Sequence, residues 1–265
     1  MPKLAAPLAS FAVLLIGSTL GCCPHRFERP AGPAPDPEML LERAGKEAAG
    51  LRSYEIMARA RLFSEGRVLK SDVEVLARRP GALRFEVVTP TGDTLAVLRT
   101  DGRRFTSHQR GDAVCAGGEA CAANVARVLP IALPPAALFD ALSGRLATLN
   151  GAQRAVEWDE CEGAWRLEQR DAVERHLAWL APGEVQPYRM ALERDGVSVL
   201  VMEVSGREAV GDVALPSALR VELPDREEQL ELDFVEVYVN GELGDELFDP
   251  VCPHGTRFQE LECPR

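Results

Sequence analysis

The fold of this chain is decided by the stretch RPGALRFEVVTPTGDTLAVLRTDGRRF at residues 79–105. Pro-Gly, Thr-Pro-Thr-Gly-Asp and Asp-Gly turn signals divide it into short segments in which apolar and polar residues alternate. In the first segment, Leu83, Phe85 and Val87 would point to one side of a strand, and the residues between them to the other. The stretch therefore predicts consecutive antiparallel strands with one apolar face.

The same alternation extends in both directions. Upstream, it predicts strands over residues 53–62 and 67–79, joined by a Ser-Glu-Gly turn. Downstream, it predicts a strand from Arg103 and seven more strands within residues 154–238. A chain of about eleven or twelve consecutive strands with two internal helices is not a doubly wound α/β fold.

Helical spacing interrupts the strands in three places. Residues 38–50 contain good helix formers and end in a glycine, which predicts a short N-terminal helix. Residues 122–129 and 134–144 carry apolar side chains three and four positions apart, and these helices would cover the concave side of the sheet. The predicted fold class is mainly β (α+β): a curved antiparallel sheet forming an incomplete barrel with a short helical plug or lid.

The composition argues against a nucleic-acid partner. The 265 residues include 30 Lys and Arg against 41 Asp and Glu, a net charge of −11, whereas binding to phosphates requires a basic face. Seven cysteines are a high count for a reduced cytosolic protein and an ordinary one for an exported protein. We therefore expect an acidic, exported domain.

The N-terminus predicts export and lipidation. Lys3 supplies a basic start, and the run Leu8–Ile16 is apolar but too short to span a bilayer as a helix. Mostly small residues then end on a cysteine, so the segment resembles a bacterial lipoprotein signal. Residues 1–21 would be removed, and Cys22 would become the acylated mature N-terminus. The alternatives are a secretory signal followed by a disulfide cysteine, or a buried apolar segment.

A lipid anchor makes the membrane the first expected partner. Several acyl chains would make attachment effectively permanent, since each buried methylene contributes about 0.8 kcal/mol. The resemblance to lipoproteins implies the outer membrane, facing the periplasm, because Cys23 stands where an Asp often favours inner-membrane retention. The proline-rich residues 22–37 predict a semi-rigid tether that holds the domain off the membrane, or a disordered leader without a mechanical role.

Six cysteines remain if Cys22 is acylated. In an oxidising compartment, Cys115 with Cys121 would close the short loop CAGGEAC, and Cys252 with Cys263 would clip the C-terminal tail. Each disulfide would stabilise the fold by about 2–3 kcal/mol through loop entropy.

The other two, Cys23 and Cys161, have no evident partner. In the tail, residues 251–265, the two cysteines and His254 offer an alternative metal site. Their spacing is not that of a zinc knuckle, so no metal site is predicted.

The sequence contains no catalytic constellation. Its four histidines are scattered, and Gly117-Gly118 is not followed by the Lys and Ser or Thr of a phosphate loop. Asp159, Glu160 and Glu162 are close together, but a run of this kind is more often a solvated turn than an acid-base pair. We therefore expect a protein that is not an enzyme and that carries no cofactor.

The order of these parts resembles the LolA/LolB family of bacterial lipoprotein carriers and receptors, together with relatives of unknown function. The parts are a lipoprotein cysteine, a short helix, the strands of residues 51–108, a helical insert ending in FDALSG and a second meander closing on DELFDP. The stretch quoted first carries the arginine, Pro-Gly, paired strands and Asp-Gly turn of that pattern. The resemblance covers residues 38–250 and defines one domain.

The resemblance implies a half-barrel whose apolar interior binds acyl chains beneath a helical lid. Small inward residues such as Ala58 and Ala60 would leave room for a ligand. The residues expected to line the hollow are Ile56, Ala58, Leu83, Phe85, Leu138, Phe139 and Leu142. The chain would then handle lipids or lipoproteins in the cell envelope. The alternative is a structural or partner-binding outer-membrane lipoprotein with a filled barrel, and the sequence names no protein partner.

Overall fold

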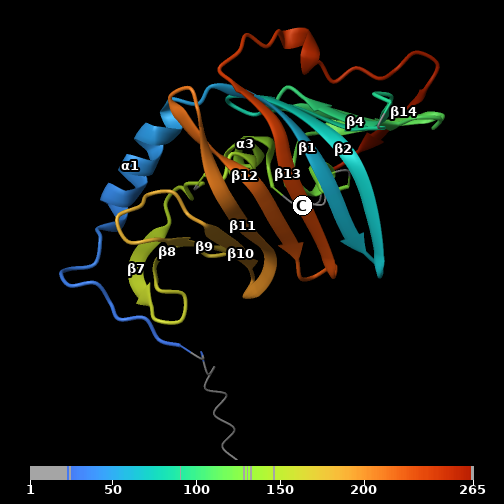
Figure 1. The fold of residues 1–265 in the computed structure, drawn as a ribbon. Helices are drawn as coiled ribbons and strands as arrows, with labels where there is room; N and C mark the ends of the chain where they lie inside the picture. Colours follow the sequence, from blue (N-terminus) through green and yellow to red (C-terminus); the bar gives the residue numbers. More distant parts are fainter. Residues whose placement is uncertain are drawn as a thin grey trace, which may run out of the picture.

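The computed structural model describes residues 23, 25–89, 91–127, 129, 131, 133–145 and 147–263. The predicted signal peptide and Cys22 lie outside the described residues. Within the described part, fourteen strands form one strongly curved sheet (Figure 1). The predicted curved sheet with short internal helices is therefore confirmed.

The strands are β1 (Ser53–Ser64), β2 (Arg67–Arg78), β3 (Ala82–Val88), β4 (Thr94–Thr100), β5 (Arg104–Gln109), β6 (Val114–Glu119), β7 (Gln153–Asp159), β8 (Ala164–Arg170), β9 (Glu174–Leu180), β10 (Arg189–Arg194), β11 (Val197–Val210), β12 (Val213–Leu223), β13 (Glu228–Val239) and β14 (Arg257–Leu261). The helices are α1 (Pro37–Ala49), α2 (Ala122–Val125), α3 (Pro135–Leu142) and the 3-10 turn η1 (Asp245–Leu247). No helix within the described ranges has the length and apolar character needed to cross a bilayer.

The strand order leaves the barrel open. Across the sheet it is β14-β6-β5-β4-β3-β2-β1-β13-β12-β11-β10-β9-β8-β7, so two meanders meet where β1 pairs with β13. Every neighbouring pair is antiparallel except β14 with β6. Among the described strands, β14 and β7 are the two ends of the sheet and do not pair with each other.

The register places the apolar residues of successive strands in rows on the concave face. Opposite residues of paired strands lie on the same face of a sheet. One such row runs across β1 to β5 through Tyr54, Ala77, Leu83, Thr100 and Phe105, and all five are buried. The alternation seen in the sequence thus becomes one continuous apolar inner surface.

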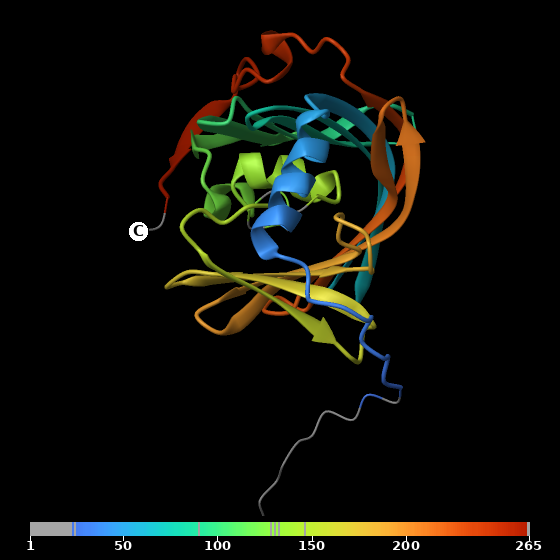
Figure 2. The same cartoon turned by 90° about the vertical axis from the view of Figure 1, so that its left-hand side faces the viewer.

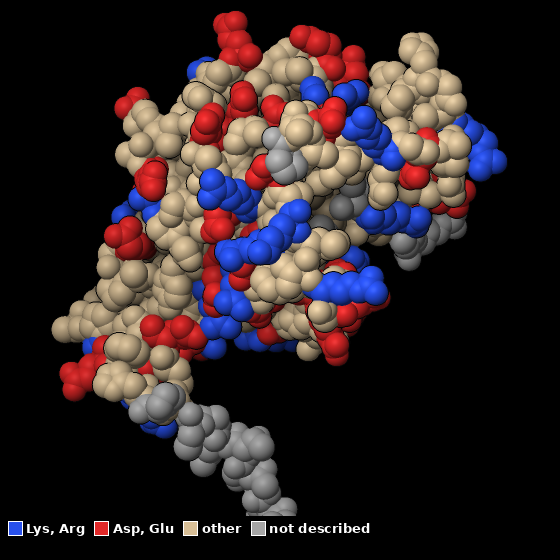
Figure 3. Space-filling view, turned by 45° about the vertical axis from the view of Figure 1, so that its right-hand side comes forward, with Lys and Arg blue, Asp and Glu red and all other residues tan. Residues whose placement is uncertain are grey.

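The outer face of the sheet carries ion pairs beside two small apolar clusters, one around Leu76 and Phe248 and one around Leu177 and Trp179. On β1, Arg61 lies 3.0 Å from carboxylate oxygens of both Glu231 and Asp233 on β13. Figure 3 shows acidic and basic side chains interspersed over one face of the molecule. Such exposed ion pairs contribute little stability, so the fold depends on its inner face.

Helix α1 begins and packs as its sequence predicts. Pro37 occupies its first turn, and the Asp36 side chain caps it by accepting a hydrogen bond of 2.9 Å from the amide of Met39. Leu40 and Leu41 are its buried residues. Leu41 joins a small apolar cluster with residues of β8 and β9, so α1 covers this end of the sheet.

Helices α2 and α3 lie inside the curve of the sheet. In Figure 2, both lie between the upper and lower parts of the sheet, with α1 in front of them. Val125 of α2 and Leu138, Phe139 and Leu142 of α3 are at most 2% exposed and belong to the main core cluster. The predicted helical plug is therefore present.

The C-terminal tail adds a strand that the sequence analysis did not predict. Strand β14 pairs in parallel with β6, with Arg257 opposite Val114 and Leu261 opposite Gly118. A Cβ atom on Gly118 would lie 2.2 Å from the carbonyl oxygen of Leu261, so only glycine permits this approach. The Gly-Gly step is thus a packing feature of the sheet edge.

The predicted pairing of Cys115 with Cys121 and of Cys252 with Cys263 is wrong. The disulfides join Cys115 to Cys252 and Cys121 to Cys263, with Cα–Cα distances of 5.8 and 6.2 Å. Both predicted loops enclose a strand, β6 or β14. Six extended residues span about 20 Å, far beyond the roughly 7 Å limit for a disulfide. The tail is therefore linked to the body of the domain and not clipped on itself.

Peptide mapping without reductant checks this connectivity. Trypsin cleaves after Arg110, Arg127, Arg226 and Arg257, which separates Cys252 from Cys263 but leaves Cys115 and Cys121 on one peptide. We expect one species of three peptides, 111–127, 227–257 and 258–265, held by two disulfides. A free 111–127 peptide with an internal disulfide would contradict the structure.

Candidate functional site

The residues predicted to line a hollow lie together in the interior. They are Ile56 and Ala58 of β1, Leu83 and Phe85 of β3, and Leu138, Phe139 and Leu142 of α3. The most exposed of them is Phe85, at 7%. They pack in one apolar cluster, in which α3 occupies the space that the sequence analysis expected to be open.

An apolar cavity of about 60 Å³ lies against a different face of α3. Ala137 and Ala141 of α3 border it, and strands β9 to β11 form the opposite wall. The principal side chains of that wall are His176, Met190, Leu192, Leu200 and Met202. None of the seven predicted residues lines this cavity.

Periodicity did not reveal this site, because it identifies inward positions but not gaps. Alternation in residues 188–194 and 197–204 indicated that Leu192 and Leu200 share an apolar face. Whether a neighbour fills the space in front of such a face depends on contacts far apart in the chain. The signal that could have found the gap is the pair Ala137 and Ala141, small residues four positions apart on one side of a helix.

A few polar contacts hold α3 against the first half of the sheet. The Tyr54 hydroxyl donates a hydrogen bond of 3.1 Å to the carbonyl oxygen of Phe139. From the loop after β2, Nη2 of Arg79 lies 2.5 Å from Oδ1 of Asp140, and its guanidinium stacks over the Phe139 ring with Cζ 4.4 Å from the centroid. Nε of Arg79 also donates to the carbonyl oxygen of Leu51. One arginine therefore joins α3 to the chain before β1.

The ion pair between Arg79 and Asp140 carries a desolvation cost. Burial raises the pKa of the Asp140 carboxyl, and the attraction of Arg79 offsets this only in part. Burial likewise raises the pKa of the Tyr54 hydroxyl, which keeps it a neutral donor. A pair of this kind adds little net stability, but removing one partner leaves the other charge uncompensated. These polar contacts thus set the position of α3 and add little to its stability.

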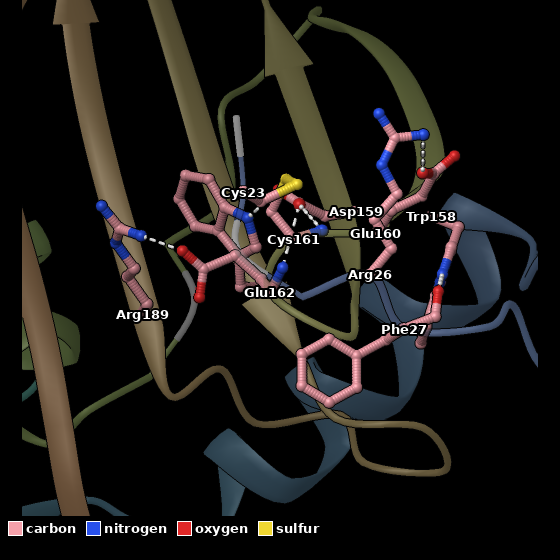
Figure 4. The surroundings of a disulfide bond; sticks show 10 residues. Cys23, Arg26, Phe27, Trp158, Asp159, Glu160, Cys161, Glu162 and Arg189 are labelled. Atoms are coloured by element: carbon pink, nitrogen blue, oxygen red, sulfur yellow. Dashed lines mark hydrogen bonds and ion pairs between the residues drawn. A yellow bond between two sulfur atoms is a disulfide. The ribbon is translucent and has the colours of Figure 1, made fainter. Parts of the chain in front are cut away.

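A second feature with functional consequences lies at the N-terminus of the described chain. Cys23 forms a disulfide with Cys161 in the turn between β7 and β8, with a Cα–Cα distance of 5.5 Å (Figure 4). The amide of Phe27 donates to the carbonyl oxygen of Glu160 at 2.8 Å, and Nε1 of Trp158 donates to the carbonyl oxygen of Phe27 at 3.1 Å. The two cysteines left over in the sequence analysis are therefore partners.

The close approach of Phe27 to the turn between β7 and β8 requires a glycine at position 163. Gly163 has a φ of +65°, and a Cβ there would lie 2.7 Å from Cγ of Phe27. The guanidinium of Arg29 lies over the Trp165 ring, 5.3 Å from its centroid. The start of the expected tether thus lies along β7 and β8 and does not stand away from the domain.

The acidic residues of the same turn have structural partners. Although burial acts to raise the pKa of Asp159, hydrogen bonds from Trp179 and from the amides of Glu162 and Cys161 lower it. Glu162 lies 2.5 Å from Arg189, and Glu160 lies 3.3 Å from Arg26 (Figure 4). Within the described residues, no group of His, Cys, Asp and Glu is arranged to hold a metal ion.

Comparison with known proteins identifies the fold. The sequence matches no protein-family model and no curated protein. A DUF1329 family protein from Desulfovibrio piger superimposes with a TM-score of 0.60 at 13% identity, covering 80% of this chain and 95% of that one. A LolA superfamily protein from Nitrosomonas europaea gives 0.53 at 13% identity, covering 81% and 98%. A putative outer membrane lipoprotein-sorting protein domain from Vibrio parahaemolyticus gives 0.53 at 9% identity, covering 81% and 97%. The chain therefore has a LolA/LolB-like fold, as its sequence pattern predicts.

The contacts of Arg79 predict how α3 responds to mutation. We expect Arg79→Gln to lower the free energy of unfolding by about 1–3 kcal/mol, because it leaves Asp140 buried without its partner. Urea unfolding measures this loss. The double variant Arg79→Gln/Asp140→Asn should recover much of it, whereas Arg67→Gln, on the exposed start of β2, should change stability by less than about 0.5 kcal/mol. Equal losses in the single and double variants would contradict the role given to this pair.

Proposed function

We propose that the protein is a non-enzymatic, lipid-anchored envelope protein that binds acyl chains between α3 and the concave face of its sheet. The observation that carries the proposal is the apolar cavity between α3 and strands β9 to β11, bordered by Ala137 and Ala141. Its wall includes Met190 and Met202, whose flexible side chains adapt to ligands of different shape. The cavity is thus the place where an acyl chain would enter the interior.

The size of the cavity requires α3 to move when ligand binds. At about 60 Å³, the space is smaller than the roughly 300–1,000 Å³ of typical ligand sites. Displacing Leu138, Phe139 and Leu142 would expose the inner faces of both meanders and provide the missing volume. An acyl chain would then cover the apolar surface of the sheet that α3 leaves, so the sheet keeps its apolar area buried.

The structural neighbours support this proposal. One belongs to the LolA superfamily and another is described as an outer membrane lipoprotein-sorting protein domain. Envelope localisation and the handling of lipids or lipoproteins fit both descriptions. We take the outer membrane, facing the periplasm, as the location, because Cys23 follows the lipidation cysteine where an Asp often favours retention in the inner membrane.

A second candidate function has an observation in its favour. The interior is largely filled by α3, which fits a structural or partner-binding lipoprotein without lipid cargo. The two candidates differ in whether α3 leaves the interior in exchange for an apolar ligand. Binding measurements on matched variants of α3 separate them.

The disulfide at Cys23 gives the proposed anchor a fixed place. If Cys22 is acylated, the lipid is attached one residue from a covalent link to the turn between β7 and β8. Residues 25–36 then cannot act as a long flexible tether, because the disulfide at Cys23 fixes the chain to the domain between the lipid and these residues. The edge of the domain formed by this turn would lie at the membrane surface.

Binding of an uncharged apolar probe tests the proposed cavity. We expect N-phenyl-1-naphthylamine to bind saturably to the purified protein, with fluorescence reporting the occupancy. Ala137→Trp should weaken binding at least about fivefold, because an indole side chain fills the small space. Ala136→Trp, on the exposed side of the same helix, is the matched control and should bind as the wild type does. An absence of saturable binding to the wild type would favour the second candidate.

Metabolic labelling with palmitate tests the anchor. The neighbouring cysteines provide an internal control: Cys22→Ala should abolish the label, whereas Cys23→Ala should retain it and lose only the disulfide to Cys161. Label that persists in the Cys22→Ala protein would refute the assignment.

A further inference from the structure

One guanidinium in the interior has no hydrogen-bond or ion-pair partner among the described residues. Arg145 lies three residues after the end of α3, is 4% exposed and lines the apolar cavity. Among the described residues, its side chain makes no hydrogen bond and no ion pair, and its Nε is fully buried without a partner. Buried arginines are almost always paired, because transfer of an uncompensated charge out of water is costly.

A second guanidinium lies beside the first. Nη2 of Arg207, on β11, donates hydrogen bonds of 2.8 and 2.9 Å to the carbonyl oxygens of Gly144 and Pro187. Its Nη1 is buried and has no partner within the described residues. Burial first, and then repulsion by the positive charge of Arg145, lower the pKa of Arg207 to about 10. Two positive charges thus lie close together next to the cavity, which Arg145 lines and Arg207 does not.

The neighbouring acids do not neutralise this charge. Asp140 is the acid with the strongest effect on Arg145, and its Oδ1 is already bonded to Arg79 at 2.5 Å. Glu47 acts on both arginines only from a distance beyond 4.0 Å, and its carboxylate accepts a hydrogen bond from Gln186. Glu184 also acts on Arg207, again from beyond 4.0 Å. Within the described part of the chain, neither Arg145 nor Arg207 therefore forms an ion pair with a carboxylate.

A purely structural role accounts for Arg207 but not for Arg145. Cations near the C-terminus of a helix stabilise its free carbonyl groups, and Arg207 does this through Gly144. Arg145 donates to no described carbonyl, and it faces the cavity. Its position resembles that of a ligand-binding group whose partner is an anion.

We infer that Arg145 and Arg207 form the head-group site for an anionic amphiphile, a single acyl chain that carries a carboxylate or phosphate. The head would accept charge-assisted hydrogen bonds from the unpaired nitrogens, and the chain would extend along Ala137, Ala141 and the wall of β10 and β11. This inference rests on the proposed function and specifies its ligand: acyl chains with an anionic head are preferred over uncharged ones.

Calorimetric titration of the wild-type protein with decanoate and 1-decanol tests the inference. The two probes share an alkyl chain and differ in the charge of the head. We expect decanoate to bind at least about tenfold more tightly than decanol. Arg145→Gln should reduce this ratio to within about threefold by weakening decanoate alone, and Arg67→Gln should leave the ratio unchanged.

The outcomes separate this inference from the proposed function. If neither probe binds, the proposed function fails. If both bind with equal affinity, the acyl site stands and the head-group site is overturned. Acetate or inorganic phosphate binding as tightly as decanoate would identify a site for free anions and would also overturn the inference. The decanoate-to-decanol ratio of the wild type decides the matter even if a variant does not fold.

Stability offers an independent readout. Because Arg145 has no partner among the residues that the structure describes, Arg145→Met should raise the melting temperature of the ligand-free protein by about 2–4 °C while lowering its affinity for decanoate. A structural role would produce the opposite change in melting temperature. A lowered melting temperature together with unchanged decanoate binding would overturn the assignment.

Discussion

A sheet that curves through fourteen strands without closing has a large concave apolar face, and α3 is the element that shields it from water. Leu138, Phe139 and Leu142 are at most 2% exposed and contact the rows of inward residues from the first meander. Burying side chains of this size contributes about 1.5–3 kcal/mol each. The helix is therefore part of the core, and any ligand that enters the interior competes with it for the same surface.

The contacts of α3 make such competition physically reasonable. Its apolar residues can be replaced by an acyl chain, and its polar fastening consists mainly of Arg79, Tyr54 and Arg207. The ion pair of Arg79 and Asp140 contributes little net free energy because both groups lose hydration. The cavity beside Ala137 and the unpaired Arg145 then mark where a chain and its head group would enter. A helix that an acyl ligand can displace needs polar contacts that set its position and contribute little free energy, and α3 has such contacts.

Covalent bonds compensate for the missing closure of the sheet. The three disulfides join residues 138, 137 and 142 positions apart, so each restrains a long loop and stabilises by about 2–5 kcal/mol. Two of them hold β14 to the β6 edge, and the third holds the start of the described chain to the β7–β8 turn. The two open ends of the sheet are thus the places where the chain is crosslinked.

The sequence predicted what local periodicity determines. Alternation in residues 53–109 gave the strands and their inward face, and helical spacing gave α1 and α3. The parallel pairing of β14 and the disulfide partners depend on residues more than a hundred positions apart, which periodicity does not relate. Periodicity also does not show that Arg145 has no partner among the described side chains. Cys115 and Cys121 were paired because they are close in sequence, although the extended strand between them separates them.

Displacement of α3 by an acyl ligand is the central claim, and a distance measurement tests it most directly. Spin labels at Ala136→Cys, on the exposed face of α3, and at Val235→Cys, on the outer face of β13, report the position of the helix relative to the sheet. The account predicts one distance in the ligand-free protein and a shift by several ångström when the site is saturated with decanoate. An unchanged distance in the saturated protein would contradict it.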